Sequence, residues 1–362
     1  PNGEAPPPWG STHSMLKESE KNKRIFFHAS KFTNFTDTIT IEETGQAAPS
    51  NSPNWLGASN NSNVWYEVLV NEDEYNYITD PAHKFYNADN QMNWVNAGNP
   101  INLPKGSNTT GEIGAMEIKA AWMEIPSPTE SQKARYKISE AVVMDPNTGV
   151  LRNTNVGLIG LHIIHKTEFQ PTWIWATFEH VDNAPDLYAT PSGEYNLYST
   201  SCTSKTMNIP AKYSASGKDT TVVINCDSIN VSPPYYLGKG GPEPTQLQVK
   251  RVTPLDNSSV QVNQTVQAAI KKYYPNSVYQ YYQLVDVIWS SNPIQDSDQP
   301  KTVPLKLLGM NPNNNVANSS LETYAQRSKC TDCHQYSTIA GSNKYASDFS
   351  FVLSAASSPT QD

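Results

Sequence analysis

The sequence predicts a mainly β (α+β) protein with a β-sandwich-like core, peripheral helices and long loops. Composition is the first reason: of the 362 residues only 37% are hydrophobic and 17% charged, while Pro and Tyr are abundant, with 27 and 19 residues. That mixture suits strands joined by ordered loops, and neither a helical bundle nor a disordered tail. The second reason is a series of apolar, strand-like runs from about residue 112, broken by turn sequences such as Asp145-Pro146-Asn147-Thr148-Gly149.

Three regions of one fold are expected. Residues 1–110 are rich in Pro, Asn and Ser, which predicts an irregular N-terminal arm and helical cover. Residues 111–317 form the predicted β-rich core, and residues 318–362 a C-terminal segment packed on it. No flexible linker and no internal repeat separates these regions.

Local signals place the elements along the chain. Val64–Val70 reads as a strand, and Asn71 is a suitable N-cap for a helix over 72–78, which Pro81 separates from a second short helix over 82–95. The strands expected in the core cover 113–125, 135–144, 150–167 and 172–181, with weaker ones at 195–199 and 220–226. The elements expected after the core strands are a helix over 260–274, a strand over 278–290, a short helix over 321–327 capped by Ser319 and Ser320, and a closing segment over 348–353.

One strand is expected to be central. The run Val156–Ile164 is apolar at successive positions rather than at alternate ones. Such a strand must be covered on both faces, because either face would otherwise expose apolar side chains to water.

Charge and hydropathy exclude two classes of partner. The net charge is −8 and no Lys/Arg cluster exists to neutralise phosphates, so we expect no nucleic-acid binding. No apolar run approaches 18 residues, so no membrane span is expected. The chain opens Pro1-Asn2-Gly3-Glu4 and is interpreted as a processed form whose signal peptide has been removed.

The most informative motif is Cys330-Thr331-Asp332-Cys333-His334. Cys-x-x-Cys-His is the pattern to which haem is attached covalently in c-type cytochromes. Two thioether bonds would join Cys330 and Cys333 to one porphyrin edge, and His334 would become the proximal iron ligand. We therefore expect one covalent haem c in the C-terminal segment.

Two other chemistries use paired cysteines. A redox dithiol of the thioredoxin type follows an apolar strand, whereas the motif here follows the polar stretch 325–329. A zinc site needs a second pair of ligands, and the two remaining cysteines supply no Cys-x-x-Cys partner.

Attachment of haem to this motif takes place outside the bacterial cytoplasm, so a periplasmic or extracellular location is expected. In that compartment Cys202 and Cys226, each with polar, loop-like flanks, are expected to form a disulfide. Two buried free thiols are the alternative.

The sixth iron ligand is not fixed by the sequence, because no Met and no His follows His334. The distal candidates are His162, His165, His180 and Met310, with His13, His28, His83 and Met144 less favoured; a ligand from a neighbouring molecule and a five-coordinate iron are also open. Gly160 shares a face with His162 and would leave room there for a flat macrocycle.

Ionisable and aromatic residues also gather on the core strands. They are either a structural ion-pair network or a polar active site near the iron, because buried charges require partners. The residues are Glu117, Lys119, Trp122, His162, His165, Lys166, Trp173, Trp175, Glu179 and His180.

Several blocks of the chain resemble a family of bacterial secreted proteins described as "cytochrome c family protein". The blocks are Gly114–Trp122, Gly157–Thr167, Trp173–Asn183, Leu321–Tyr324 with the following Cys-x-x-Cys-His, and Asp348–Leu353. They cover about a third of the chain, and residues 1–110 lie outside them. The resemblance implies a monohaem extracytoplasmic protein and carries no established reaction.

Three functions are therefore weighed. Electron transfer by a secreted monohaem c-type cytochrome is the leading hypothesis, since no Gly-x-Ser-x-Gly, His-Glu-x-x-His or phosphate-binding loop is present. A haem-dependent oxidoreductase of the peroxidase type, with an open iron site, is the second. The third is a haem-bearing structural or assembly protein, a possible homo-oligomer through the N-terminal arm. The expected partner is a redox protein or an extracellular electron acceptor.

Overall fold

The computed structural model describes most of the chain from residue 56 onward. The described residues are 56–60, 62, 64–144, 151–200, 207–208, 248–311 and 315–358, together with 3, 5, 6, 8, 9 and 24–26. The predicted disulfide between Cys202 and Cys226, the weak strand over 220–226 and the histidines His13 and His28 lie outside the described residues.

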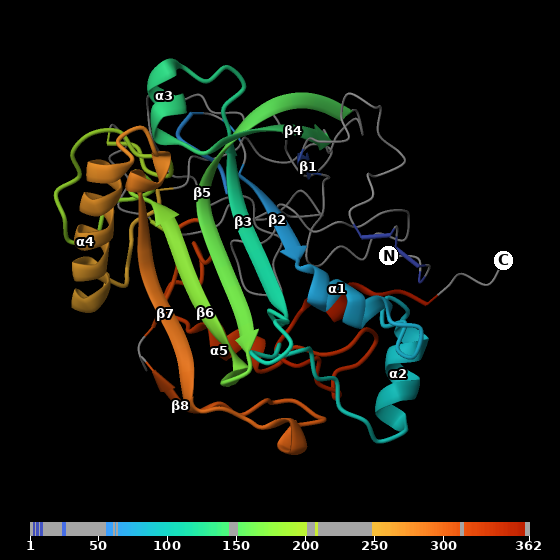
Figure 1. The fold of residues 1–362 in the computed structure, drawn as a ribbon. Helices are drawn as coiled ribbons and strands as arrows, with labels where there is room; N and C mark the ends of the chain where they lie inside the picture. The colour runs from blue at the N-terminus through green and yellow to red at the C-terminus, as the bar shows by residue number, and fades with distance from the viewer. Residues whose placement is uncertain are drawn as a thin grey trace, which may run out of the picture.

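The centre of the fold is an eight-stranded sheet with the order β1-β4-β5-β6-β7-β8, in which β2 and β3 extend from β5 (Figure 1). All pairings are antiparallel except that of β1 with β4. The strands are β1 Arg24–Phe26, β2 Val64–Val70, β3 Met116–Glu124, β4 Ile138–Met144, β5 Leu151–Thr167, β6 Gln170–His180, β7 Tyr282–Asn292 and β8 Leu308–Asn311.

A mainly β fold with peripheral helices is thus confirmed. The strands belong to one sheet rather than to two facing sheets, and the second layer over one face is the C-terminal segment. β2 comes from the region expected to be an N-terminal cover, yet it pairs with β3 over its whole length.

β5 is the central strand that its apolar run predicts. It pairs with β4 through its first half, with β3 from Val156 to His165 and with β6 from Gly160 onward. Its residues 156–160 are all buried, so neither face of this part meets solvent. The prediction holds because each face packs into its own hydrophobic cluster: Ile159 into the one with Leu321, and Leu158 into the one with Trp122.

Five α-helices lie around the sheet in the described part of the chain: α1 Glu72–Thr79, α2 Ala88–Asn96, α3 Glu130–Arg135, α4 Asn257–Tyr273 and α5 Cys330–His334. Asn71 caps α1 as predicted, with its side chain accepting from the Glu74 N–H. α2 begins later than residue 82, since Asn87 accepts from the N–H groups of Asp89 and Asn90 and makes the N-cap there.

Three local predictions differ from the structure. Residues 278–281 form a 3₁₀ turn before β7, and residues 195–199 form no strand. Residues 321–327 form turns rather than a helix, and the helix begins at Cys330 instead. α3 was not predicted, although Thr129 and Gln132 form a capping box at its start.

The C-terminal segment crosses the face of the sheet that carries Gly160 and His162. Tyr66 donates to the Ser320 carbonyl over 2.8 Å, and Asn318 donates to the Phe178 carbonyl over 2.6 Å. A side chain at position 160 would collide with the Ser320 hydroxyl, so glycine there permits the close approach. The room above Gly160 is therefore filled by the chain's own C-terminal segment, not left for a macrocycle.

Candidate functional site

The Cys-x-x-Cys-His motif forms the one-turn helix α5, which lies behind the lower half of β5 and β6 in the view of Figure 1. Cys330 and Cys333 are three residues apart on this turn, so their side chains project from the same side. Cys330 is partly buried against the hydrophobic cluster that contains Trp175 and Phe349, whereas Cys333 is exposed. One sulfur is thus anchored in the core and the other lies at the surface.

The His334 ring is held by a backbone group from the closing segment. Its Nδ1 lies 2.6 Å from the Phe349 carbonyl oxygen, and its ring packs edge-on to Phe351 at 5.0 Å. A carbonyl can only accept, so Nδ1 carries the proton and donates. In the neutral imidazole the lone pair then lies on Nε2, which is the nitrogen that a metal ion would take.

The Phe349 carbonyl is fixed by an unusual backbone. Asp348 and Phe349 have φ angles of 57° and 66°, in the left-handed region that residues with a Cβ rarely occupy. The Asp348 carboxylate accepts from the Leu103 N–H at 2.8 Å and from Gln299 at 2.7 Å, and its own carbonyl accepts from Trp173. Strain of this kind persists only where the surroundings over-determine the conformation.

A buried ion pair completes the support of Asp348. Lys166 Nζ lies 2.6 Å from Asp348 Oδ2, and neither side chain is more than 1% exposed. Lys166 Nζ also donates to Asn102 Oδ1 at 2.9 Å. Burial raises the pKa of Asp348, and Lys166 opposes that rise. The pair ties β5 to the segment that orients His334.

Of the predicted distal ligands, His162 lies closest to the path of the C-terminal segment. Its Nε2 is 3.3 Å from Glu322 Oε2, eight residues before Cys330. Burial opposes ionisation of Glu322, but His162 and then Lys119 favour it, and the pKa of Glu322 lies below its usual value. The nearest group to His162 Nε2 is therefore a carboxylate of the chain itself.

His165 and His180 are engaged by backbone groups. His165 Nε2 lies 3.0 Å from the Ile113 carbonyl. His180 is fully buried, its Nδ1 accepts from the Asp182 N–H at 3.1 Å, and its Nε2 donates to the Arg135 carbonyl at 3.2 Å. Both nitrogens of His180 thus have partners, and its ring stacks on Tyr136 at 4.1 Å.

His180 gives a pH-dependent stability that can be measured. Burial lowers the pKa of His180 to about 4, while Asp182 opposes that shift. Between pH 6.5 and 4 the unfolded chain binds a proton that the folded chain does not, so stability falls as the pH is lowered through this window. We measure the unfolding free energy in urea at pH 7.5 and at pH 4.5. The difference between the two values is expected to be about 2–3 kcal/mol smaller in His180→Gln than in the wild type. An unchanged pH difference in the variant would contradict this role.

Met310 is the distal candidate that shares a hydrophobic cluster with Cys330. It lies on β8 opposite Ser290 and packs, like Cys330, against the cluster of Trp175, Ile288 and Phe349. Neither residue is at the centre of that cluster. Both border it, so no further geometry links Met310 to the motif.

The ionisable residues on the core strands are mostly paired within the structure. Glu179 forms an ion pair with Arg251 and accepts from the Ser319 hydroxyl at 2.7 Å. Trp122 donates to Glu67 at 3.1 Å. These contacts favour the interpretation as a structural network that fastens the C-terminal segment to the sheet. Glu117 differs, since the ionisable side chain that hydrogen-bonds to it is a second carboxyl, that of Glu74.

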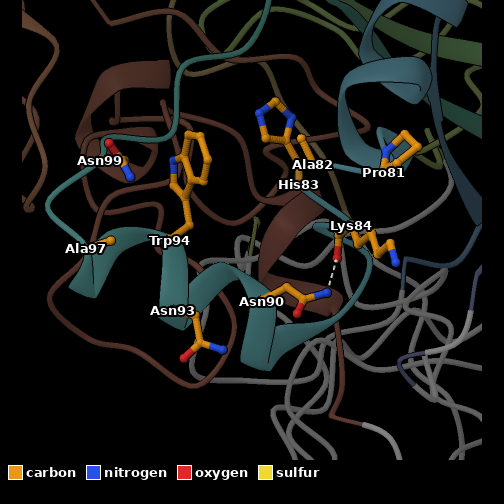
Figure 2. Close-up of a pocket in the computed structure, with 9 residues that line it drawn as sticks. All are labelled: Pro81, Ala82, His83, Lys84, Asn90, Asn93, Trp94, Ala97 and Asn99. Carbon is orange, nitrogen blue, oxygen red and sulfur yellow. Dashed lines mark hydrogen bonds between the residues drawn. The ribbon is translucent and has the colours of Figure 1, made fainter.

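Two hollows on the part of the surface that the structure describes are not lined by the motif. The first has a volume of about 410 Å³ and lies beside α2; its lining is Pro81, Ala82, His83, Lys84, Asn90, Asn93, Trp94, Ala97 and Asn99 (Figure 2). His83 Nδ1 lies 3.2 Å from the Tyr77 carbonyl, and its ring stacks on Phe85 at 4.8 Å. The second, about 690 Å³, contains the ion pair of Arg135 with Asp182.

Sequence reasoning missed the residues that support His334. The sequence predicts that Asp348 and Phe349 belong to the closing segment, but it gives them no functional role. It predicts that Glu74 is helical and indicates nothing more about it. No motif marks a residue that acts through its carbonyl group. Glu74 is the buried residue of α1. The sequence does not show which side of that helix is buried, so it does not distinguish Glu74 from the acidic residues beside it.

Comparison of the chain with family models, with curated proteins and with solved structures finds no match. The resemblance to secreted cytochrome c proteins thus stays a prediction. In the described residues no helix is long and apolar enough to cross a membrane. The same residues contain no group of three His, Cys, Asp or Glu side chains arranged to hold a metal ion.

Proposed function

We propose that this chain is an extracytoplasmic monohaem c-type cytochrome that acts in electron transfer. The observation that carries the proposal is the orientation of His334 within Cys330-x-x-Cys333-His334, where Nδ1 donates to the Phe349 carbonyl. In metal sites the ligating histidine is held in this way, because the second hydrogen bond fixes the tautomer and the ring plane. Backbone strain of the kind found at Asp348 and Phe349 is concentrated at functional sites.

The sulfurs also suit thioether formation better than redox exchange. Burial raises the pKa of the Cys330 thiol, and the charge of Glu322 adds to the rise. A redox dithiol needs a thiolate, which is produced by a lowered pKa. Cys330 is instead a neutral thiol beside apolar side chains, which is compatible with a permanent bond to a haem vinyl group.

In this proposal Cys330 and Cys333 hold the porphyrin edge, and His334 Nε2 binds the iron. The haem, when bound, supplies a centre that accepts and returns one electron. Cys333 is exposed and Tyr336 is 55% exposed, so we expect the haem to lie at the surface. An exposed edge allows electron exchange with a partner protein or an extracellular acceptor.

A haem-dependent oxidoreductase with an open iron site is the second candidate. It is favoured by the hydrogen bonds that engage both nitrogens of His180 and one of His165. If neither residue binds iron, the sixth position could receive peroxide or another small molecule. The Cys202–Cys226 disulfide and the location outside the cytoplasm belong to the proposal in either case.

Spectroscopy of the protein purified from a host that attaches haem to such motifs tests the proposal. Electron transfer predicts a mass increase of one haem, a reduced α-band of the c type, and a low-spin ferric iron that does not respond to cyanide or CO. A high-spin iron that binds both ligands would assign the oxidoreductase instead. Absence of covalent haem would refute both.

A further inference from the structure

Two glutamates meet beneath the segment that orients His334. Glu74 on α1 is fully buried and Glu117 on β3 is 6% exposed. Their carboxyl groups interact with each other, and among the described residues both oxygens of Glu74 and one of Glu117 find no further hydrogen-bond partner. Adjacent buried carboxyls cannot both ionise at ordinary cost, so such a pair retains a proton.

The charges around the pair do not neutralise it. Lys166 faces it from β5 but is bound to Asp348, whose negative charge faces the pair from the C-terminal segment. On β3, Lys119 lies two residues from Glu117 on the same face and interacts with Glu322. On α1, Asp73 accepts from the Gly114 N–H at 2.7 Å. Lys166 is thus the cation that acts on Glu74, and it is already paired with Asp348.

The titration of the pair falls near neutral pH. Burial raises the pKa of Glu74, and the Glu117 carboxyl raises it further. Burial also raises the pKa of Glu117, to about 7, against a hydrogen bond from the Ser350 side chain. The first proton is thus held firmly and the second exchanges in a physiological range.

A single peptide unit joins this pair to the haem motif. The Ser350 hydroxyl bonds Glu117, and the carbonyl of the preceding residue, Phe349, accepts from His334 Nδ1 at 2.6 Å. From the ring nitrogen to the carboxyl is therefore on the order of 10 Å along the chain of bonds. A unit charge at the iron acts on the pair over a similar range, through protein rather than water.

We propose that Glu74 and Glu117 form a proton-binding site whose affinity for a proton rises when an iron bound by His334 is reduced. This proposal rests on the proposed haem function. A one-electron donor converts ferric to ferrous iron, and one proton from solvent converts a carboxylate of the pair to a carboxylic acid. Oxidation of the iron returns the electron to an acceptor and the proton to solvent.

The midpoint potential measured from pH 5 to pH 9 tests the linkage. Reduction adds negative charge, so it raises the proton affinity of the pair, and the potential must fall as the pH rises through the window near 7. A tenfold change in affinity, about what a unit charge at this separation produces, gives a total fall of about 59 mV. Glu117→Gln is expected to abolish the fall.

Glu124→Gln is the matched control, since Glu124 is a buried carboxyl on the same strand that pairs with Arg152 and Trp65. It should keep the wild-type slope. If Glu117→Gln fails to fold, Glu74→Gln and the double variant replace it. If the midpoint potential of every folded variant of the pair still falls with pH as in the wild type, the proposal is overturned.

Infrared titration of the carboxylic acid band separates this proposal from the haem function. A component of that band that titrates near pH 7 and is absent from Glu117→Gln supports the shared proton site whether or not haem is attached. If the protein carries no haem, the proposed function fails and the linkage fails with it. If both carboxyls ionise near pH 4–5, as exposed glutamates do, the proton site is refuted even in a haem-bearing protein.

Discussion

The double variant Cys330→Ala, Cys333→Ala is expected to carry no covalent haem, whereas the wild-type chain gains the mass of one haem per molecule. The reason is chemical: a thioether bond to each vinyl group needs a sulfur, and the two sulfurs of α5 are the pair proposed to bind one porphyrin edge. Intact-mass spectrometry and the haem absorption of the denatured protein give the answer, because a covalent haem stays with the chain after unfolding.

Thr331→Ala is the control for this experiment. Thr331 lies between the two cysteines on the same helical turn and supplies neither sulfur nor ligand. It should leave attachment complete. The proposal is contradicted if the denatured double variant still carries haem. It is also contradicted if the wild-type chain carries none.

Lys166→Met is expected to cost about 3–5 kcal/mol of unfolding free energy at pH 7, the largest stability effect foreseen for a single substitution. Lys166 and Asp348 are both buried, and removal of the cation leaves the Asp348 carboxylate with two neutral donors, the Leu103 N–H and Gln299, but without its countercharge. The cost arises from the charge left behind rather than from the pair itself, so Lys166→Met with Asp348→Asn should be milder than Lys166→Met alone.

An exposed ion pair is the reference for that loss. Lys133 and Glu130 on α3 lie 2.8 Å apart with side chains that are 52% and 90% exposed. Lys133→Met should change stability by less than about 1 kcal/mol, since solvent screens the pair. Urea unfolding of the two variants compares them directly. Equal effects would show that the Lys166–Asp348 pair does not hold the closing segment.

The sequence predicts strands better than it predicts what covers them. The apolar run of β5 and the Asn71 cap of α1 are local features, and both are found as expected. α4 is also a helix, as expected over 260–274, but Val262 and Val266, which lie at helical spacing within it, are 46% and 48% exposed. Its sheet side is polar instead: Asn263 bonds both the N–H and the carbonyl of Leu284. Helical spacing shows that a helix forms, and not which face it buries.

Only part of the candidate site can be predicted from the sequence. Cys330, Cys333 and His334 are adjacent in the chain, so a short pattern identifies them. The groups that hold the site are not adjacent: Asp348 bonds Lys166, 182 residues earlier, and Leu103, 245 residues earlier. Such contacts depend on how the sheet is covered, which local patterns do not encode. The sequence leaves the distal ligand open for the same reason.

These long-range contacts also bear on the order of events during folding. The carbonyl that holds His334 belongs to Phe349, and the neighbouring Asp348 bonds Lys166, 182 residues earlier on β5. Contacts that span so much of the chain form late, because the loss of chain entropy comes before the gain in contact energy. A machinery that attaches haem before that moment meets an extended Cys-x-x-Cys-His peptide, and must recognise it by its few residues and not by its surroundings.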